Sequence, residues 1–138
     1  MRTKQLTPTR EDYIRAIYIL NNRLGKQVRV KDLTEYLHLS KSTISERLRE
    51  LARNHLIVAA PYGSVTLTKR GMEAAKALTY KHRVIEVFLF QILHIPREQL
   101  HEEANKLEHG VSDMVLTKLA RHVGYPRIDP HGVAIVTE

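Results

Sequence analysis

Apolar residues in the first third of the chain recur at helical spacing. Tyr13, Ile14, Ile17 and Leu20 form an apolar stripe after the Thr7-Pro8-Thr9 start signal, and Gly25 predicts that this helix ends near Leu24. A second helix is expected over 31–37. A third is expected over 41–54, with Ser40 as its N-cap. Ile44, Leu48 and Leu51 repeat at i, i+4 and i+7, so they would bury one face of the third helix.

Two short β-prone runs follow these helices. Residues 56–60 and 65–68 flank the turn residues Pro61-Tyr62-Gly63-Ser64, which predicts a β-hairpin. Helix, short turn, helix and hairpin follow one another in the order of a winged helix-turn-helix.

The remaining sequence predicts only helices. Thr68 would cap a long helix to about residue 93, and 84–93 are apolar nearly all round, which favours burial on several sides and a homodimer interface. Pro96 and Ser112 introduce two shorter helices, ending near 110 and 123. The expected fold is therefore mainly α. Residues 1–72 form a winged helix-turn-helix of three helices plus a hairpin wing, and 73–138 form an α-helical dimerisation domain, linked by the helix over about 69–93.

Charge divides the chain in the same way. The net charge is +7, but residues 1–80 carry 15 Lys/Arg against 7 Asp/Glu, whereas 81–138 carry 7 against 8. Clustered positive charge binds phosphates by releasing counterions, so duplex DNA is the expected partner of the first part. A basic but unoccupied surface would explain the charge alone equally well.

The composition excludes several other classes of protein. Cysteine is absent, so disulfides and thiolate metal sites are excluded. No apolar run approaches the roughly 18 residues of a membrane span, and no signal peptide pattern opens the chain. We therefore expect a cytoplasmic protein that has no membrane partner.

Residues of metal-ligand type repeat at helical spacing in the second part. His82 and Glu86 are four residues apart on one predicted helix, and a second set follows on the next helix: His101, Asn105, Glu108 and His109. The short connection makes these helices antiparallel neighbours, so the two sets would converge. Imidazole and carboxylate without thiolate suit Mn, Fe, Co or Zn. Solvated surface pairs are an equally probable explanation.

The order of motifs resembles a known family. Residues 7–14, the helix-turn-helix with its wing, Tyr80-Lys81-His82-Arg83 and Leu107-Glu108-His109 resemble the diphtheria-toxin-repressor (DtxR/MntR) family of metal-dependent regulators. The match is nearest to its manganese transport regulator branch, and it covers nearly the whole chain. Larger iron-responsive members add a C-terminal SH3-like domain, which the printed sequence is too short to contain.

The resemblance implies two metal sites. The primary site would use Asp12, Asn105, Glu108 and His109, and the ancillary site would use His82, Glu86 and His101. Asn105 stands where the family has Cys or Glu, and Arg15 stands where two-metal manganese regulators have a ligand Glu. Thr9-x-x-Asp12 is also a capping-box spacing, which by itself would explain an acidic residue at position 12.

The resemblance also places the DNA contacts on the third helix and the wing. The residues expected at the interface are Lys41, Ser42, Thr43, Glu46, Arg47 and Tyr62. Lys41 and Arg47 would contact phosphates, and Glu46 would accept a hydrogen bond from cytosine.

These observations predict a metal-dependent DNA-binding transcriptional regulator that is not an enzyme. It would repress metal-uptake genes as a homodimer on a pseudo-palindromic operator, and Mn²⁺ would activate it, with Fe²⁺ or Zn²⁺ as alternative ions. The rival hypotheses are a winged-helix regulator without metal control, a Zn²⁺- or Fe²⁺-responsive regulator, a metallohydrolase, and a metal-buffering helical dimer.

Overall fold

The computed structural model describes residues 10–60 and 63–127. The chain divides into two compact units, 1–76 and 77–138, and the division falls within one long helix. In the described residues the fold is mainly helical, as predicted. The helices are α1 (Arg10–Leu24), α2 (Val30–Leu37), α3 (Lys41–Arg53), α4 (Lys69–Gln91), α5 (Arg97–Glu108) and α6 (Asp113–His122), and the strands are β1 (Val28–Arg29), β2 (Ile57–Ala59) and β3 (Ser64–Leu67).

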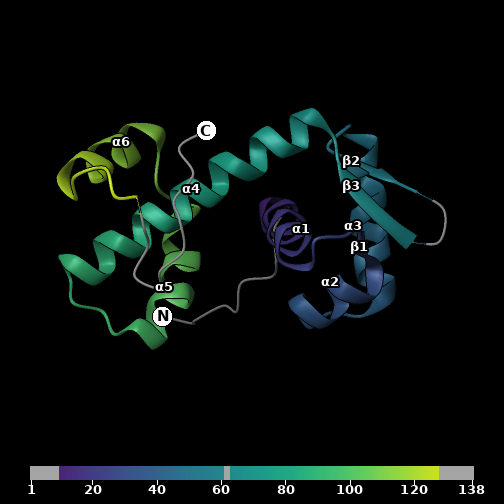
Figure 1. Ribbon diagram of the computed structural model, residues 1–138, viewed down its shortest axis with the longest axis horizontal. Coiled ribbons are helices and arrows are strands. Elements are labelled where there is room, and N and C mark those ends of the chain that lie inside the picture. Colours follow the sequence, from purple (N-terminus) through teal and green to yellow (C-terminus); the bar gives the residue numbers. More distant parts are fainter. Residues whose placement is uncertain (1–9, 61–62, 128–138) are drawn as a thin grey trace. The chain divides into compact units, whose positions relative to one another are not determined.

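The first unit is a helix-turn-helix with a small sheet (Figure 1). α2 ends at Leu37, and its C-cap His38 has the left-handed φ of 56° that terminates many helices, whereas α3 begins directly after Ser40. The Ser40 side chain accepts a hydrogen bond from the Thr43 backbone N–H at 3.2 Å, so the predicted N-cap is confirmed. The buried core unites the stripes of α1 and α3 with the sheet through Tyr13, Ile17, Leu33, Ile44, Leu51 and Val65.

The sheet contains one strand more than the hairpin that was expected. β2 and β3 pair antiparallel with Val58 opposite Thr66, which confirms the hairpin, and β1 adds to the other edge of β3 with Val28 opposite Val65. The strand order is β1-β3-β2. β1 has only two residues, too few to show an alternating pattern. The wing residue Tyr62 and the start signal at Thr7-Pro8-Thr9 lie outside the described residues.

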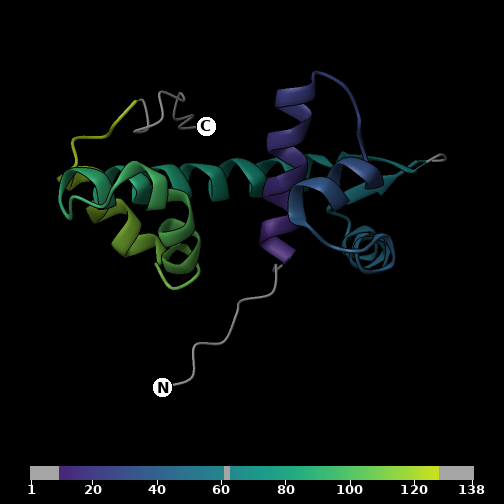
Figure 2. The ribbon, with the colours of Figure 1, turned by 90° about the horizontal axis from the view of Figure 1, so that it is seen from below.

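The second unit packs α5 and α6 against the C-terminal half of α4 (Figures 1 and 2). Its core consists of Ile85, Leu89, Leu100, Ala104 and Val111. The predicted helix to residue 93 ends two residues earlier. Ile92 and Leu93 follow the last helical residue and are 40% and 52% exposed. The predicted burial of this apolar segment on several sides therefore does not extend to these two residues. None of the helices in the described ranges is long and apolar enough to cross a bilayer.

The start of α4 is joined tightly to the residues before the wing. The Thr68 hydroxyl donates to the His55 carbonyl at 2.7 Å, and the Thr68 N–H donates to the Leu56 carbonyl at 3.0 Å. The same hydroxyl accepts from the Gly71 N–H at 3.0 Å, which confirms Thr68 as the cap. A Cβ at position 71 would overlap with the carbonyl oxygen of Leu56. Glycine at this position therefore allows the close approach.

We expect Gly71→Ala to destabilise the chain by about 1–3 kcal/mol, because backbone must move to admit the new methyl group. Urea unfolding measures this change. Gly110→Ala is the matched control, since its Cβ would meet nothing closer than the Leu107 carbonyl oxygen at 3.8 Å. Equal midpoints for the two variants would contradict the proposed close approach.

Candidate metal centre and nucleic-acid interface

His82 lies at the centre of a cluster of metal-ligand side chains in the second unit. Its Nε2 atom is 3.0 Å from Oε1 of Glu86 and 3.2 Å from Nδ1 of His101. Its Nδ1 atom is 3.4 Å from Oε1 of Glu108. The two predicted ligand sets therefore converge, with His82 and Glu86 from α4 and His101 and Glu108 from α5.

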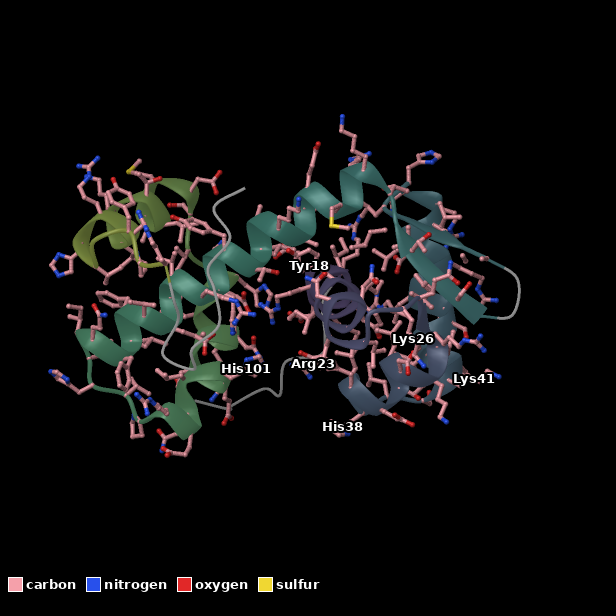
Figure 3. The ribbon with its side chains drawn as sticks, viewed as in Figure 1. Tyr18, Arg23, Lys26, His38, Lys41 and His101 are labelled. Atoms are coloured by element: carbon pink, nitrogen blue, oxygen red, sulfur yellow. The ribbon has the colours of Figure 1, made fainter. Side chains whose placement is uncertain are left out.

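Local helical geometry explains this arrangement. His82 and Glu86 are one turn apart on the side of α4 that faces α5, and the core contacts of Ile85 and Leu100 hold the two helices together. His82, Glu86 and Glu108 are 4%, 1% and 2% exposed, whereas His101 reaches the surface of α5 (Figure 3). The cluster thus has buried carboxylates and one solvent-facing imidazole.

The donor atoms of His82, Glu86 and His101 fit a divalent ion. One atom from each residue lies within 4.8 Å of the other two. Two donors about 2.1 Å from one ion and at right angles to each other are about 3.0 Å apart. The Nε2 contacts of His82, at 3.0 and 3.2 Å, match that spacing. Nitrogen and oxygen donors without sulfur suit Mn²⁺, Fe²⁺, Co²⁺ or Zn²⁺.

The imidazole of His82 lies between two carboxylates, with Glu108 beside Nδ1 and Glu86 beside Nε2. A neutral imidazole carries one proton, and a carboxylate only accepts hydrogen bonds. An ion bound at Nε2 would use the lone pair of that atom, and the single ring proton would then lie on Nδ1 and be donated to Glu108. This carboxylate–imidazole pairing is the one that orients metal-binding histidines in proteins.

The outer face of α5 carries a separate network of charges. Nζ of Lys106 is 3.5 Å from carboxylate oxygens of both Glu102 and Glu103. These carboxylates, Glu103 more than Glu102, raise the pKa of Lys106 above its ordinary value. All three residues are exposed or half-buried, so this network belongs to the surface.

The predicted primary ligands come from both units. Asp12 lies in the first turn of α1, where its Oδ1 atom is 3.8 Å from Nη2 of the buried Arg15. Asn105 and Glu108 lie one turn apart on α5, and His109 continues the helical conformation at its C-cap. Asn105, Glu108 and His109 thus share one face of α5. Their meeting with Asp12 stays a prediction.

The predicted DNA-contacting residues of α3 form one exposed surface. Lys41, Ser42, Thr43, Glu46 and Arg47 are all exposed, and Figure 3 shows Lys41 at the surface of the first unit. The hydroxyl of Ser40 is 2.8 Å from that of Thr43 and 3.3 Å from that of Ser42. The start of α3 thus presents ordered hydroxyl groups at the N-terminus of a helix, a combination suited to phosphate.

Arg47 forms an ion pair within α3 in addition to its predicted role in DNA binding. Its Nη1 atom is 3.1 Å from Oε2 of Glu50, one turn along α3. This pair is about half exposed, so water screens it and Arg47 can still reach a phosphate.

Two family models match the chain. Residues 5–65 match the N-terminal DNA-binding domain of iron-dependent repressors, and residues 68–137 match their metal-binding and dimerisation domain. Because these matches cover nearly all of the sequence, the chain belongs to the iron-dependent repressor family, a family of metal-dependent transcriptional regulators. This confirms the family, the fold and the class of function predicted from the sequence.

Relatives of this family cover most of the chain. An uncharacterised HTH-type transcriptional regulator of Methanocaldococcus jannaschii is 33% identical over 79% of this chain and 87% of its own length. The HTH-type transcriptional regulator MntR of Bacillus subtilis is 29% identical, over 86% and 82% respectively.

Solved structures show the same fold in longer chains. The manganese regulator SloR superposes with a TM-score of 0.84 at 37% identity, over 94% of this chain and 60% of that one. A manganese-dependent transcriptional repressor in complex with manganese gives a TM-score of 0.86 at 37% identity, over 92% and 58%. The chain thus spans about three fifths of the length of these proteins.

We expect His82→Ala to abolish tight metal binding at the cluster. Loss of a residue that only hydrogen-bonds to a metal ligand typically weakens metal binding by about 10–100-fold. His82 would itself be a ligand, so its loss should weaken metal binding by more. Isothermal titration calorimetry with Mn²⁺ or Co²⁺ should show a loss of at least about 100-fold in affinity at one site. His122→Ala, which removes an exposed imidazole from α6, is the control. Identical titration curves for His82→Ala and the wild-type protein would exclude the cluster as a site.

Proposed function

We propose that this protein is a transcriptional repressor whose binding to duplex DNA is activated by a divalent metal ion. The observation that carries the proposal is the cluster around His82, in which imidazole and carboxylate donors from two helices meet in a chain that begins with a winged helix-turn-helix. The family assignment supports both halves of this function.

The ancillary site would be the cluster of His82, Glu86 and His101. These residues would hold the ion, which would supply positive charge beside the buried carboxylate of Glu86. Glu108 would accept a hydrogen bond from Nδ1 of His82 and so orient the ring with Nε2 toward the ion.

The primary site would use Asp12, Asn105, Glu108 and His109. An ion held by residues from both units would favour one arrangement of the DNA-binding unit over others. Metal then shifts the population toward the arrangement that binds DNA, because it binds that arrangement more tightly. Asn105 would contribute a neutral oxygen where the family resemblance implies Cys or Glu, so we expect a lower metal affinity than an acidic residue would give.

Manganese is the ion that we rank first, with Fe²⁺ and Zn²⁺ as alternatives. Carboxylate and amide oxygens suit Mn²⁺, and the absence of cysteine removes the ligand that most favours Zn²⁺. The named similar structures include a manganese regulator and a repressor in complex with manganese.

The protein would bind its operator as a homodimer in the cytoplasm. A twofold dimer presents two copies of α3, which would enter successive major grooves about 34 Å apart on a pseudo-palindromic site. Repression of metal-uptake genes when the ion is plentiful follows from activation by the same ion.

We expect Mn²⁺ to raise DNA affinity at fixed ionic strength, and Asp12→Ala and His109→Ala to abolish that increase. Both variants should keep weak, salt-sensitive binding, because it depends on the basic first part of the chain. Fluorescence anisotropy with promoter duplexes, titrated with Mn²⁺, Fe²⁺, Co²⁺ and Zn²⁺, measures this.

Asp113→Ala and His122→Ala are the matched controls, because they remove the same side-chain types from exposed positions of α6. They should respond to metal like the wild-type protein. Metal-independent binding by every variant would leave a winged-helix regulator without metal control.

A further inference from the structure

The buried side of α3 defines which of its residues point furthest from the first unit. Ile44, Leu48 and Leu51 are 0%, 5% and 1% exposed, and they lie on one side of the helix. At 3.6 residues per turn, a second stripe lies directly across from them. Its members are Ser42, Glu46, Arg49 and Arg53, and all four are exposed. Figure 2 looks almost along α3 and shows this helix at the edge of the unit.

Arg49 differs from its neighbour Arg47 in position and in partners. Arg47 lies on the flank of α3 and is paired with Glu50 at 3.1 Å. Arg49 lies in the outermost stripe, and within residues 10–60 and 63–127 its guanidinium makes neither an ion pair nor a hydrogen bond. Its five N–H donors are therefore available to a ligand in front of α3.

Glu46 indicates what that ligand is. It lies one turn before Arg49 on the same stripe, and a carboxylate there repels phosphate but accepts a hydrogen bond from the N4 amino group of cytosine. Arginine donates two parallel hydrogen bonds to O6 and N7 of guanine, a frequent specific contact in the major groove. Three residues of helix rise by about 4.5 Å, close to one base-pair step of about 3.4 Å.

We infer that Arg49 is a base-reading residue, which selects a guanine in the base pair next to the cytosine contacted by Glu46. This inference rests on the proposed function, since it assumes that α3 enters the major groove. It assigns each operator half-site two neighbouring G·C pairs and divides the arginines of α3 by role. Arg49 discriminates between sequences, and Arg47 contacts the backbone.

Arg53 provides an internal control. It shares the outermost stripe but is the last residue of α3, about 6 Å further along the axis than Arg49. As the last residue of the helix, Arg53 is the member of this stripe furthest from the N-terminal end that contacts the bases, so it is placed for phosphate instead. Its removal should weaken binding to every sequence alike.

In vitro selection from a duplex pool with a randomised central region, in the presence of Mn²⁺, tests the inference with the full chain. The wild-type protein should select half-sites with two adjacent G·C pairs. Arg49→Ala should lose the preference at one of these pairs, with discrimination there falling about 10- to 100-fold. Glu46→Gln should change the preference at the neighbouring pair only. Arg53→Ala and Arg47→Ala should select the wild-type sequence at lower affinity.

Three outcomes are distinguishable. Loss of preference at a single position in Arg49→Ala supports the inference. An unchanged selected sequence in Arg49→Ala, with affinity lowered uniformly, makes Arg49 a phosphate contact and overturns it. Failure of the wild-type protein to select any sequence with metal present overturns the proposed function instead. Because Arg49 is exposed, the thermal unfolding midpoint of the Arg49→Ala variant should match that of the wild-type protein. A lowered midpoint would identify a folding defect separately from a loss of base reading.

Discussion

The second unit depends on the contacts of one buried side chain, His82, whose two ring nitrogens face residues of both α4 and α5. Nδ1 of His82 faces Glu108, and Nε2 faces Glu86 and His101. Both carboxylates are almost fully buried, and a carboxylate removed from water is stable only beside positive charge or hydrogen-bond donors. A divalent cation next to Nε2 would supply such charge. Ion binding at this cluster would therefore be coupled to the packing of α4 on α5.

Much of the fold could be predicted from local signals. The caps of three helices, Ser40, Thr68 and Ser112, are side chains whose hydroxyls satisfy backbone N–H groups a few residues away, so the sequence alone identifies them. The apolar stripes of α1 and α3 are equally local. The ligand pairs on α4 and α5 were predictable because helical spacing places residues four apart on one face.

The missing parts depend on contacts between distant residues. β1 consists of Val28 and Arg29 and exists because β3 offers an unpaired edge, which no two-residue pattern reveals. The contact between His82 and Glu108 joins residues 26 positions apart, and family resemblance assigned them to different metal sites. The Arg47–Glu50 pair is local. The different position of Arg49, opposite the buried side of α3, becomes clear only once the buried side of that helix is known. The meeting of Asp12 with α5 remains a prediction, because it involves both units.

The donor set of the cluster has a consequence for stress physiology. Peroxide and disulfide-forming oxidants attack thiolates, and a sensor that binds its ion through cysteine loses the ion when the sulfur is oxidised. His82, Glu86 and His101 offer no sulfur, and the whole sequence contains no cysteine. A metal ion held by this set would have no thiolate ligand that an oxidant could convert to a sulfenic acid or a disulfide. Loss of the ion through oxidation of a cysteine ligand would therefore not occur at this cluster.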